Sequence, residues 1–282
     1  MAQQTVVGNG SQQLILQMSN PKGIRLAWTA TTPADITVAV LQNTIITASL
    51  RREGKTTTIM NGNALALGVS DLQSTGDGLV VNGEFTACYV PFAKLKRDGL
   101  NDMGVVNLRK DDQLIIQVST SSAATGQQVT FSDQQGTGPE LYTPEVSVYV
   151  INRNQSIMNV PLPGYVDGIA VVNSLEEYGL LNMNLQCSDP AFFMQDNVAD
   201  FRSKLSQSIS GGQAANPTFY SWSAYEGAPL CDASLTVGVD TTDSGNTYIV
   251  IYGGNSSPSV MANAARTLAK IQRSNARKFL GR

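Results

Sequence analysis

Histidine is absent from this chain of 282 residues. Histidine is the most frequent general base and a common metal ligand, so its absence excludes a Ser-His-Asp triad and most metal-hydrolase sites. The three cysteines, Cys88, Cys187 and Cys231, are far apart and include no Cys-x-x-Cys pair. We therefore expect reduced, mostly buried thiols, and neither a disulfide framework nor a zinc site.

Charge is also scarce. Only 15% of the residues are charged, whereas about 25% is typical of soluble domains. Ser, Thr, Asn and Gln take the place of the missing ions. Neutral polar groups cost less to desolvate than ions, so such a surface suits contact with neighbouring subunits.

Sequence signatures of enzymes and of export are missing as well. There is no GxxxxGK[ST] loop, no GxGxxG after a strand and no GxSxG. The start of the chain lacks the basic and apolar regions of a signal peptide, and no run approaches the roughly 18 apolar residues of a membrane-spanning helix. We therefore expect a soluble protein made in a cytoplasm, with no catalytic residues, no cofactor, no metal and no small-molecule substrate.

A few acidic groups still permit a chemical interpretation. Asp111-Asp112 and Glu176-Glu177 are carboxylate pairs, such as a glycosidase uses. Adjacent residues of a strand point to opposite faces, however, so neither pair is well placed to share one site. Asp240 and Asp243 could bind Ca²⁺, but a solvated hairpin turn explains them more simply.

Aromatic residues offer an alternative function. Trp28, Trp222, Tyr220 and Tyr225 could line a sugar-binding groove, which would favour a carbohydrate- or receptor-binding β-protein such as a phage spike. The alternation around Trp222 is equally that of a strand with a buried aromatic face. Another phage structural protein, such as a minor capsid protein, is a further alternative.

Short β-type runs dominate the chain. They are bounded by Gly, Asn or Asp at intervals of about 8–12 residues, the spacing of sandwiches and barrels. In the first half the runs are Leu14–Met18, Ile24–Trp28, Ile36–Leu41, Thr44–Leu50, Thr56–Met60, Leu79–Val81, Glu84–Val90, Val105–Leu108 and Gln113–Ser119. In the second half they are Val146–Ile151, Ile169–Val172, Leu180–Leu185, Thr218–Tyr225, Ala233–Val239 and Thr247–Tyr252.

Composition suggests where these runs divide. Residues 119–143 are rich in Gly, Ser, Gln and Pro and predict a linker around a short strand at Val129–Phe131. We therefore predict a first β-domain over 1–143, which includes this linker, and a second over 144–254. A hinge and a C-terminal helix follow over 255–282.

Two helices are predicted between strands. Asp189 is a good N-cap and Pro190 suits the first helical position. Apolar residues recur at helical spacing from Val198 to Ile209, which predicts a helix over Pro190–Ile209. Pro91–Arg97 is a shorter helical candidate. A hairpin is expected across Gln42-Asn43, between two of the β-type runs.

The last 22 residues hold six Lys/Arg and no Asp/Glu. The chain has 19 basic and 22 acidic residues, so its first 260 residues carry 13 positive charges against 22 negative ones. The glycines and serines of residues 253–258 indicate a flexible hinge before this segment. We predict that the basic residues face a membrane or a genome; they are Arg266, Lys270, Arg273, Arg277, Lys278 and Arg282.

On a helical wheel the tail is amphipathic: Leu268, Ile271 and Phe279 lie opposite Arg266 and Arg273. Three interpretations remain open. The helix could dock on its own domain, lie on an anionic membrane, or contact nucleic acid phosphates.

Taken together, the layout resembles the double jelly-roll major capsid proteins of tailless bacteriophages with an internal membrane, such as corticoviruses. The matching features are two strand-rich halves, Leu14–Gln117 and Val146–Tyr252, with helical inserts at Pro91–Arg97 and Pro190–Ile209. The resemblance implies an all-β fold of two tandem eight-stranded sandwiches. It also implies a homotrimer that builds an icosahedral virion shell with neighbouring capsomers and penton or minor capsid proteins, around lipid or genomic DNA.

Removal of residues 261–282 is expected to leave the β-fold intact and to weaken binding to anionic liposomes or DNA. The segment carries six of the 19 cations, and contacts with phosphates are electrostatic and therefore sensitive to salt. Liposome flotation and gel-shift assays measure the binding, and circular dichroism checks the fold. Unchanged binding after the deletion would refute this role.

Overall fold

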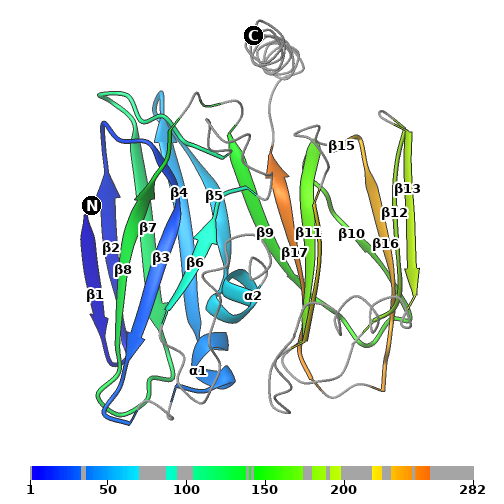
Figure 1. Ribbon diagram of the computed structural model, residues 1–282, viewed down its shortest axis with the longest axis horizontal. Helices are drawn as coiled ribbons and strands as arrows, with labels where there is room; N and C mark the ends of the chain where they lie inside the picture. Colours follow the sequence, from blue (N-terminus) through cyan, green and yellow to red (C-terminus); the bar gives the residue numbers. More distant parts are fainter. Residues whose placement is uncertain are drawn as a thin grey trace, which may run out of the picture.

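Over the residues that it describes, the computed structural model in Figure 1 is almost entirely β-structure, with two short helices. It describes residues 2–32, 36–69, 87–93, 104–137, 140, 143–173, 180–188, 191–197, 218–223, 230–242 and 245–254.

The first half forms a sandwich of eight strands. One sheet has the order β1-β8-β3-β6, and facing it are β2, β7, β4 and β5 in that order. The alternating burial along β7, where every second side chain is buried, shows why these sequences form half-buried strands. The strands are β1 (Gln3–Val7), β2 (Gly10–Leu16), β3 (Pro21–Thr29), β4 (Thr44–Arg52), β5 (Lys55–Asn63), β6 (Ala87–Pro91), β7 (Gln113–Thr120) and β8 (Gln128–Gln135).

The second half repeats this path. Its sheets have the orders β9-β17-β11-β14 and β10-β16-β12-β13, and β15 adds a short pairing to β11. The strands are β9 (Pro144–Val150), β10 (Ile157–Val160), β11 (Tyr165–Asn173), β12 (Leu180–Ser188), β13 (Ala191–Asn197), β14 (Thr218–Ser223), β15 (Leu230–Cys231), β16 (Ser234–Val239) and β17 (Thr247–Gly254). Eight antiparallel strands connected in this way form a jelly roll. The predicted fold class, two tandem jelly rolls, is confirmed.

The two sandwiches share one continuous sheet. β5 pairs with β9 in parallel, with Met60 opposite Val146 and Asn61 opposite Ser147. This pairing joins the sheets into a single one with the order β14-β11-β17-β9-β5-β4-β7-β2. Figure 1 shows the result: the sandwiches stand side by side with their strands running in similar directions.

The two smaller sheets cover opposite faces of the shared sheet. On one face, Met60 aligns with Val146 and Tyr252, and all three belong to the core of the first sandwich. On the other face, Asn61 aligns with Ser147 and Ile251. Ile251 lies in the core of the second sandwich, whereas Asn61 is exposed. The same sheet face is therefore open in the first half and buried in the second.

Two short helices fill the space beside the shared sheet, α1 (Val38–Gln42) and α2 (Ala64–Val69). Asn63 caps α2, because its Oδ1 accepts a hydrogen bond of 2.8 Å from the Ala66 N–H. α2 contacts β17 and β11 as well as β4, β5 and β6. Figure 1 shows both helices between the two sandwiches. As a result, every residue of β11 and β17 is buried, on both faces of the sheet.

The helix predicted at Pro190–Ile209 is wrong at its start. Ala191–Asn197 forms β13, which pairs with β12 from Ser188↔Ala191 to Asn182↔Asn197. The helical spacing of apolar residues begins only at Val198, so the N-cap signal alone favours a helix over Ala191–Asn197. Pairing with a neighbouring strand outweighs that local signal. Residues 198–209 lie outside the described residues.

Other local predictions also need correction. Pro91, the predicted start of the helix Pro91–Arg97, is the last residue of β6, and residues 94–97 are outside the described part. Ile36–Leu41 is not a hairpin strand, because α1 begins at Val38. The predicted linker 119–143 contains the whole of β8, an eight-residue strand at the centre of the sandwich. The domain bounds 1–143, 144–254 and 255–282 stay a prediction.

Two glycines predicted to begin a hinge are instead part of a buried strand. Gly253 and Gly254 end β17, and both are buried. A Cβ atom on Gly253 would meet the backbone oxygen of Tyr165 and would lie 2.8 Å from Pro163 Cγ. Glycine is required here because two backbones approach closely. Residues 255–282, including the predicted C-terminal helix, lie beyond the described residues.

Gly253→Ala is expected to lower the free energy of unfolding by about 1–3 kcal/mol, the usual cost of overpacking a filled core. Gly10→Ala is the matched control, because a Cβ there would find its nearest heavy atoms at 3.8 Å and 3.9 Å. Urea unfolding of both variants measures the difference. Equal stability of the two would contradict the packing role of Gly253.

Candidate functional site at the joint between the sandwiches

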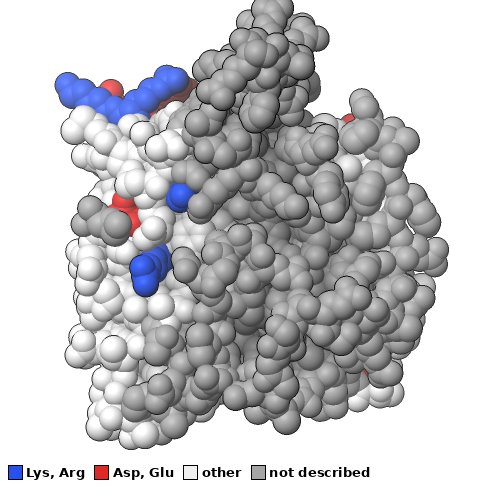
Figure 2. Space-filling view, in the orientation of Figure 1, with Lys and Arg blue, Asp and Glu red and all other residues white. Residues whose placement is uncertain are grey.

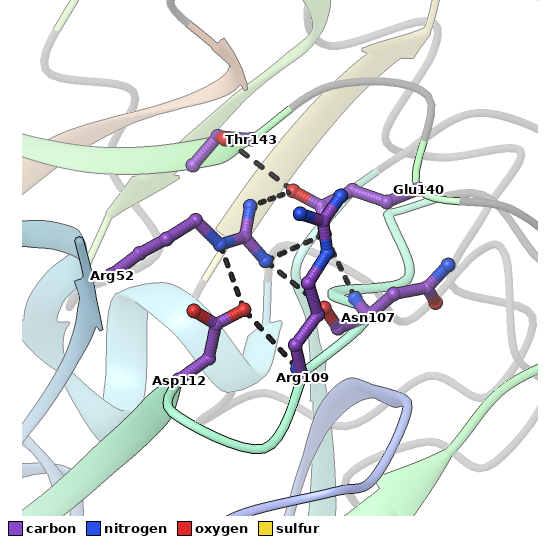
Figure 3. A network of polar contacts seen from close by, with 6 residues as sticks. All are labelled: Arg52, Asn107, Arg109, Asp112, Glu140 and Thr143. Carbon is purple, nitrogen blue, oxygen red and sulfur yellow. Dashed lines mark hydrogen bonds and ion pairs between the residues drawn. The ribbon is translucent and has the colours of Figure 1, made fainter.

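A polar network holds the connection between the two sandwiches to the first one. Arg52, the last residue of β4, forms two parallel bonds with Glu140, which lies between β8 and β9. Nη1 lies 2.7 Å from Oε1, and Nη2 lies 2.9 Å from Oε2. This bidentate geometry is the strongest form of an Arg–carboxylate pair. Figure 3 shows Arg52 at the centre of the network.

The same guanidinium also binds the loop that precedes β7. Arg52 Nε donates to Asp112 Oδ2 at 3.0 Å, and Nη2 donates to the carbonyl oxygen of Asn107 at 3.0 Å. The carboxylates have further donors: the Asn107 N–H bonds to Glu140 at 2.9 Å, and the Arg109 N–H bonds to Asp112 at 3.1 Å. One arginine thus connects a strand end, a loop and the segment that leads into β9.

Burial and charge make this network strong. The Asp112 side chain is only 6% exposed and that of Arg52 27%. Hydrogen bonding to Glu140 is the main cause that raises the pKa of Arg52, although burial opposes it. Burial alone would raise the pKa of Asp112, but hydrogen bonds from Arg109 and Arg52 outweigh it and hold that pKa below its ordinary value. Both groups are therefore charged at neutral pH and serve to hold the structure.

The carboxylate candidates from the sequence have structural roles where they are described. Asp112 is bound by Arg52, and its neighbour Asp111 is exposed. Asp240 Oδ1 accepts bonds from the Thr242 N–H at 3.0 Å and from its hydroxyl at 2.6 Å, as in a solvated turn. Asp243 and Glu176-Glu177 lie outside the described residues. Within the described ranges no cluster of three His, Cys, Asp or Glu side chains could hold a metal ion.

Of the cysteine, aromatic and basic candidates from the sequence, the structure describes only some. Cys88 and Cys187 are buried, Cys231 is partly buried, and all three are free thiols as predicted. Trp28 is buried in the first core and cannot line an open groove. The side chains of Tyr220 and Trp222 and the whole of Tyr225 are outside what the structure describes. So are the six tail cations Arg266, Lys270, Arg273, Arg277, Lys278 and Arg282, whose role stays a prediction.

Sequence reasoning did not find the Arg52 network. Its partners are 60 and 88 residues away along the chain. The only local sign was the pair Asp111-Asp112, next to a strand and without an enzymatic context. Among the described residues, no helix has the length and apolar character needed to cross a bilayer.

Comparison with solved structures found matches of differing quality. The major capsid protein P2 from bacteriophage PM2 matches with a TM-score of 0.50 and 14% identity, over 91% of this chain and 99% of that one. The Sulfolobus Turreted Icosahedral Virus structure scores 0.49 with 9% identity, over 96% and 98%. PNGase F, a glycosylasparaginase from Flavobacterium meningosepticum, scores 0.30 with 8% identity, over 91% and 98%.

The match to P2 extends over almost the full length of both proteins. This chain therefore shares the fold of P2, and the structural resemblance predicted from the sequence is confirmed. The other two structures, with TM-scores of 0.49 and 0.30, are too dissimilar to indicate a function. No known family profile matches the sequence, and no curated protein does.

Arg52→Met is expected to lower the free energy of unfolding by roughly 2–4 kcal/mol, because it leaves Asp112 and Glu140 without their cation in a partly buried site. Arg51→Met, at the exposed neighbouring position, is the matched control and should change stability by less than about 0.5 kcal/mol. Chemical denaturation measures both variants. Similar values for the two would show that the network does not stabilise the fold.

Proposed function

We propose that this protein is a viral major capsid protein that assembles as pseudo-hexagonal trimers into an icosahedral shell. The observation that carries the proposal is the match in fold to the major capsid protein P2 over nearly the whole of both chains. On this proposal the protein is made in the host cytoplasm and resides in the capsid of the virion. Its partners are neighbouring copies, and it performs no reaction.

The architecture supports this role geometrically. Each chain carries two sandwiches of the same topology, standing side by side (Figure 1). Three chains around a threefold axis present six similar lobes, which gives a six-cornered outline that can tile a flat facet. Cyclic arrangement through head-to-tail contacts is a common way to close such a ring.

Tiling also requires a fixed spacing between the two lobes. Here the spacing is set by the β5–β9 pairing, by the burial of both faces of β11 and β17, and by Arg52, which holds the connecting segment. A hydrogen-bonded sheet and a filled core resist bending far more than a flexible linker does. The joint therefore suits a rigid building block.

The surface composition fits repeated contacts of moderate strength. Figure 2 shows one face of the molecule, where the described surface is largely uncharged, with Lys and Arg at its upper left edge and a few smaller basic and acidic patches below them. A neutral polar surface at the border of a subunit, here called its rim, is desolvated at low cost. Many such contacts around each subunit stabilise a shell without any single tight interface. Penton or minor capsid proteins are expected to meet the same kind of rim.

The basic tail supplies the contact with the interior. Six cations without an acidic neighbour, from Arg266 to Arg282, suit the phosphates of an internal membrane or of genomic DNA. The body of the chain is acidic, so the tail is the segment suited to bind an anionic layer.

Sedimentation velocity at micromolar concentration tests the proposal, with the expectation of a trimer that resists dilution. Negative-stain images of the same sample should show three-lobed particles with a six-cornered outline. A monomer that persists at these concentrations would refute the capsid role.

A further inference from the structure

The outer end of the first sandwich carries no charge. The first charged residue of the chain is Lys22, so β1, β2 and their connections are entirely neutral. Both strands are outermost in their sheets: among the described strands, β1 pairs with β8 alone and β2 with β7 alone. Figure 1 places them at the end of the molecule farthest from the second sandwich.

An edge of this kind is unusual in a protein that stays monomeric. Natural edge strands are shielded from association by Lys, Pro, bulges or short length. β2 is seven residues long, Gly10–Leu16, with none of these residues and no register shift against β7. Ile15, within this strand, is 54% exposed, and Met18, just after it, is 74% exposed. The exposed edge of β2 therefore has the character of a surface that another chain covers.

The neutral character continues from this edge over most of the outer face of β2, β7, β4 and β5, as far as the exposed Arg51 near the end of β4. Gln13, Gln117, Thr47 and Asn61 form one row across the four strands. Their side chains bond within the face: Gln13 donates to Gln117 at 3.2 Å, and Thr47 to Asn61 at 3.3 Å. The neighbouring rows are equally neutral; they contain Ser11, Ser119 and Ile45, and Ile15, Ile115, Ser49 and Thr58.

This face is the open half of a sheet surface that is covered elsewhere. Along the row of Asn61, the same surface continues to Ser147 and Ile251, where the second sandwich's outer sheet covers it. The open half therefore has room beside that outer sheet for one more layer, about 10 Å thick. Amides and hydroxyls on it can bond with a similar neutral face at little cost in desolvation.

The second sandwich offers such a face. Outward positions of its outer sheet are also neutral: Asn159 on β10, Thr236 on β16, and Asn182 and Gln186 on β12. Thr236 donates to Asn159 at 3.0 Å, so this face has a bonded polar row like that of the first sandwich. Ile157 adds an exposed apolar side chain at its border.

We propose that the neutral surface of the first sandwich, formed by the β2 edge and the outer face of β2-β7-β4-β5, binds the outer face of β10-β16-β12 of a second copy. This inference rests on the proposed function and names the contact that closes the trimer. First and second sandwiches then alternate around the ring, and each copy uses both surfaces once, as a closed head-to-tail ring requires.

The size of the surface agrees with this role. Four strands about 4.8 Å apart and seven residues long cover about 440 Å², and the edge adds about 230 Å². The total of about 670 Å² is close to the roughly 800 Å² that each partner contributes to a standard stable interface.

Charge insertion tests the contact. Gln13→Lys and Gln117→Lys place a cation on the neutral surface and are each expected to raise the dissociation constant of the trimer at least tenfold. Gln134→Lys is the matched control, because Gln134 is on β8 in the sheet that packs on the opposite face. Its trimer should be unchanged. Sedimentation velocity measures association, and thermal unfolding confirms that all three variants fold.

Cross-linking tests the pairing without adding charge. A chain with Gln13→Cys and Ser234→Cys together should give covalent trimers with a short bis-maleimide, and either substitution alone should not. A covalent dimer from Gln13→Cys alone would overturn the head-to-tail arrangement.

The outcomes separate this inference from the proposed function. A trimer that survives both Gln13→Lys and Gln117→Lys, or is lost equally with Gln134→Lys, overturns the docking surface and leaves the capsid role intact. A trimer that persists while only larger particles are lost overturns the ring contact. A monomeric unmodified protein overturns both.

Discussion

The parallel pairing of β5 with β9 is the constraint on which the rest of the structure depends. It turns two sandwiches into one body, because strands from both halves then belong to a single sheet. It also determines which faces of the sheet are covered. Because Met60 aligns with Val146 and Asn61 with Ser147, each face of the first half continues into the second half. Only two residue pairs form this junction, so it needs support from elsewhere.

That support comes from packing on one side and from charge on the other. α2 lies against β17 and β11, so that the first core extends beneath the second sandwich and includes Tyr248 and Tyr252. Arg52 holds the connecting segment through Glu140, and its remaining donors hold the loop before β7. In a medium of reduced dielectric, a bidentate pair with further donors on both carboxylates resists displacement. The ionised groups of this site therefore maintain geometry, as the proposed role of a shell subunit requires.

The distribution of charge follows the same logic. Among the described residues of the first sandwich, ions lie near the β4–β5 hairpin, at the joint and on β3, while the β2 edge and most of the face beside it are neutral. A monomeric protein needs charge, Pro, a bulge or a short strand at such an edge to prevent association. A subunit that associates does not, and any ion there would lose its hydration on assembly. Scarcity of charge in the composition thus corresponds to particular surfaces in the fold.

The sequence by itself determined the β-class, most strand positions and the division into two similar halves, because alternation and turn residues are local signals, as in β7 and β17. It misassigned β13 and α1, where pairing and packing outweighed a local cap or a short apolar run. Only the tertiary structure decided that the halves share a sheet, that Arg52 meets Glu140, and that Gly253 is packed against Tyr165. Each of these contacts joins residues far apart in the chain, and no local pattern encodes which distant partner a side chain will find.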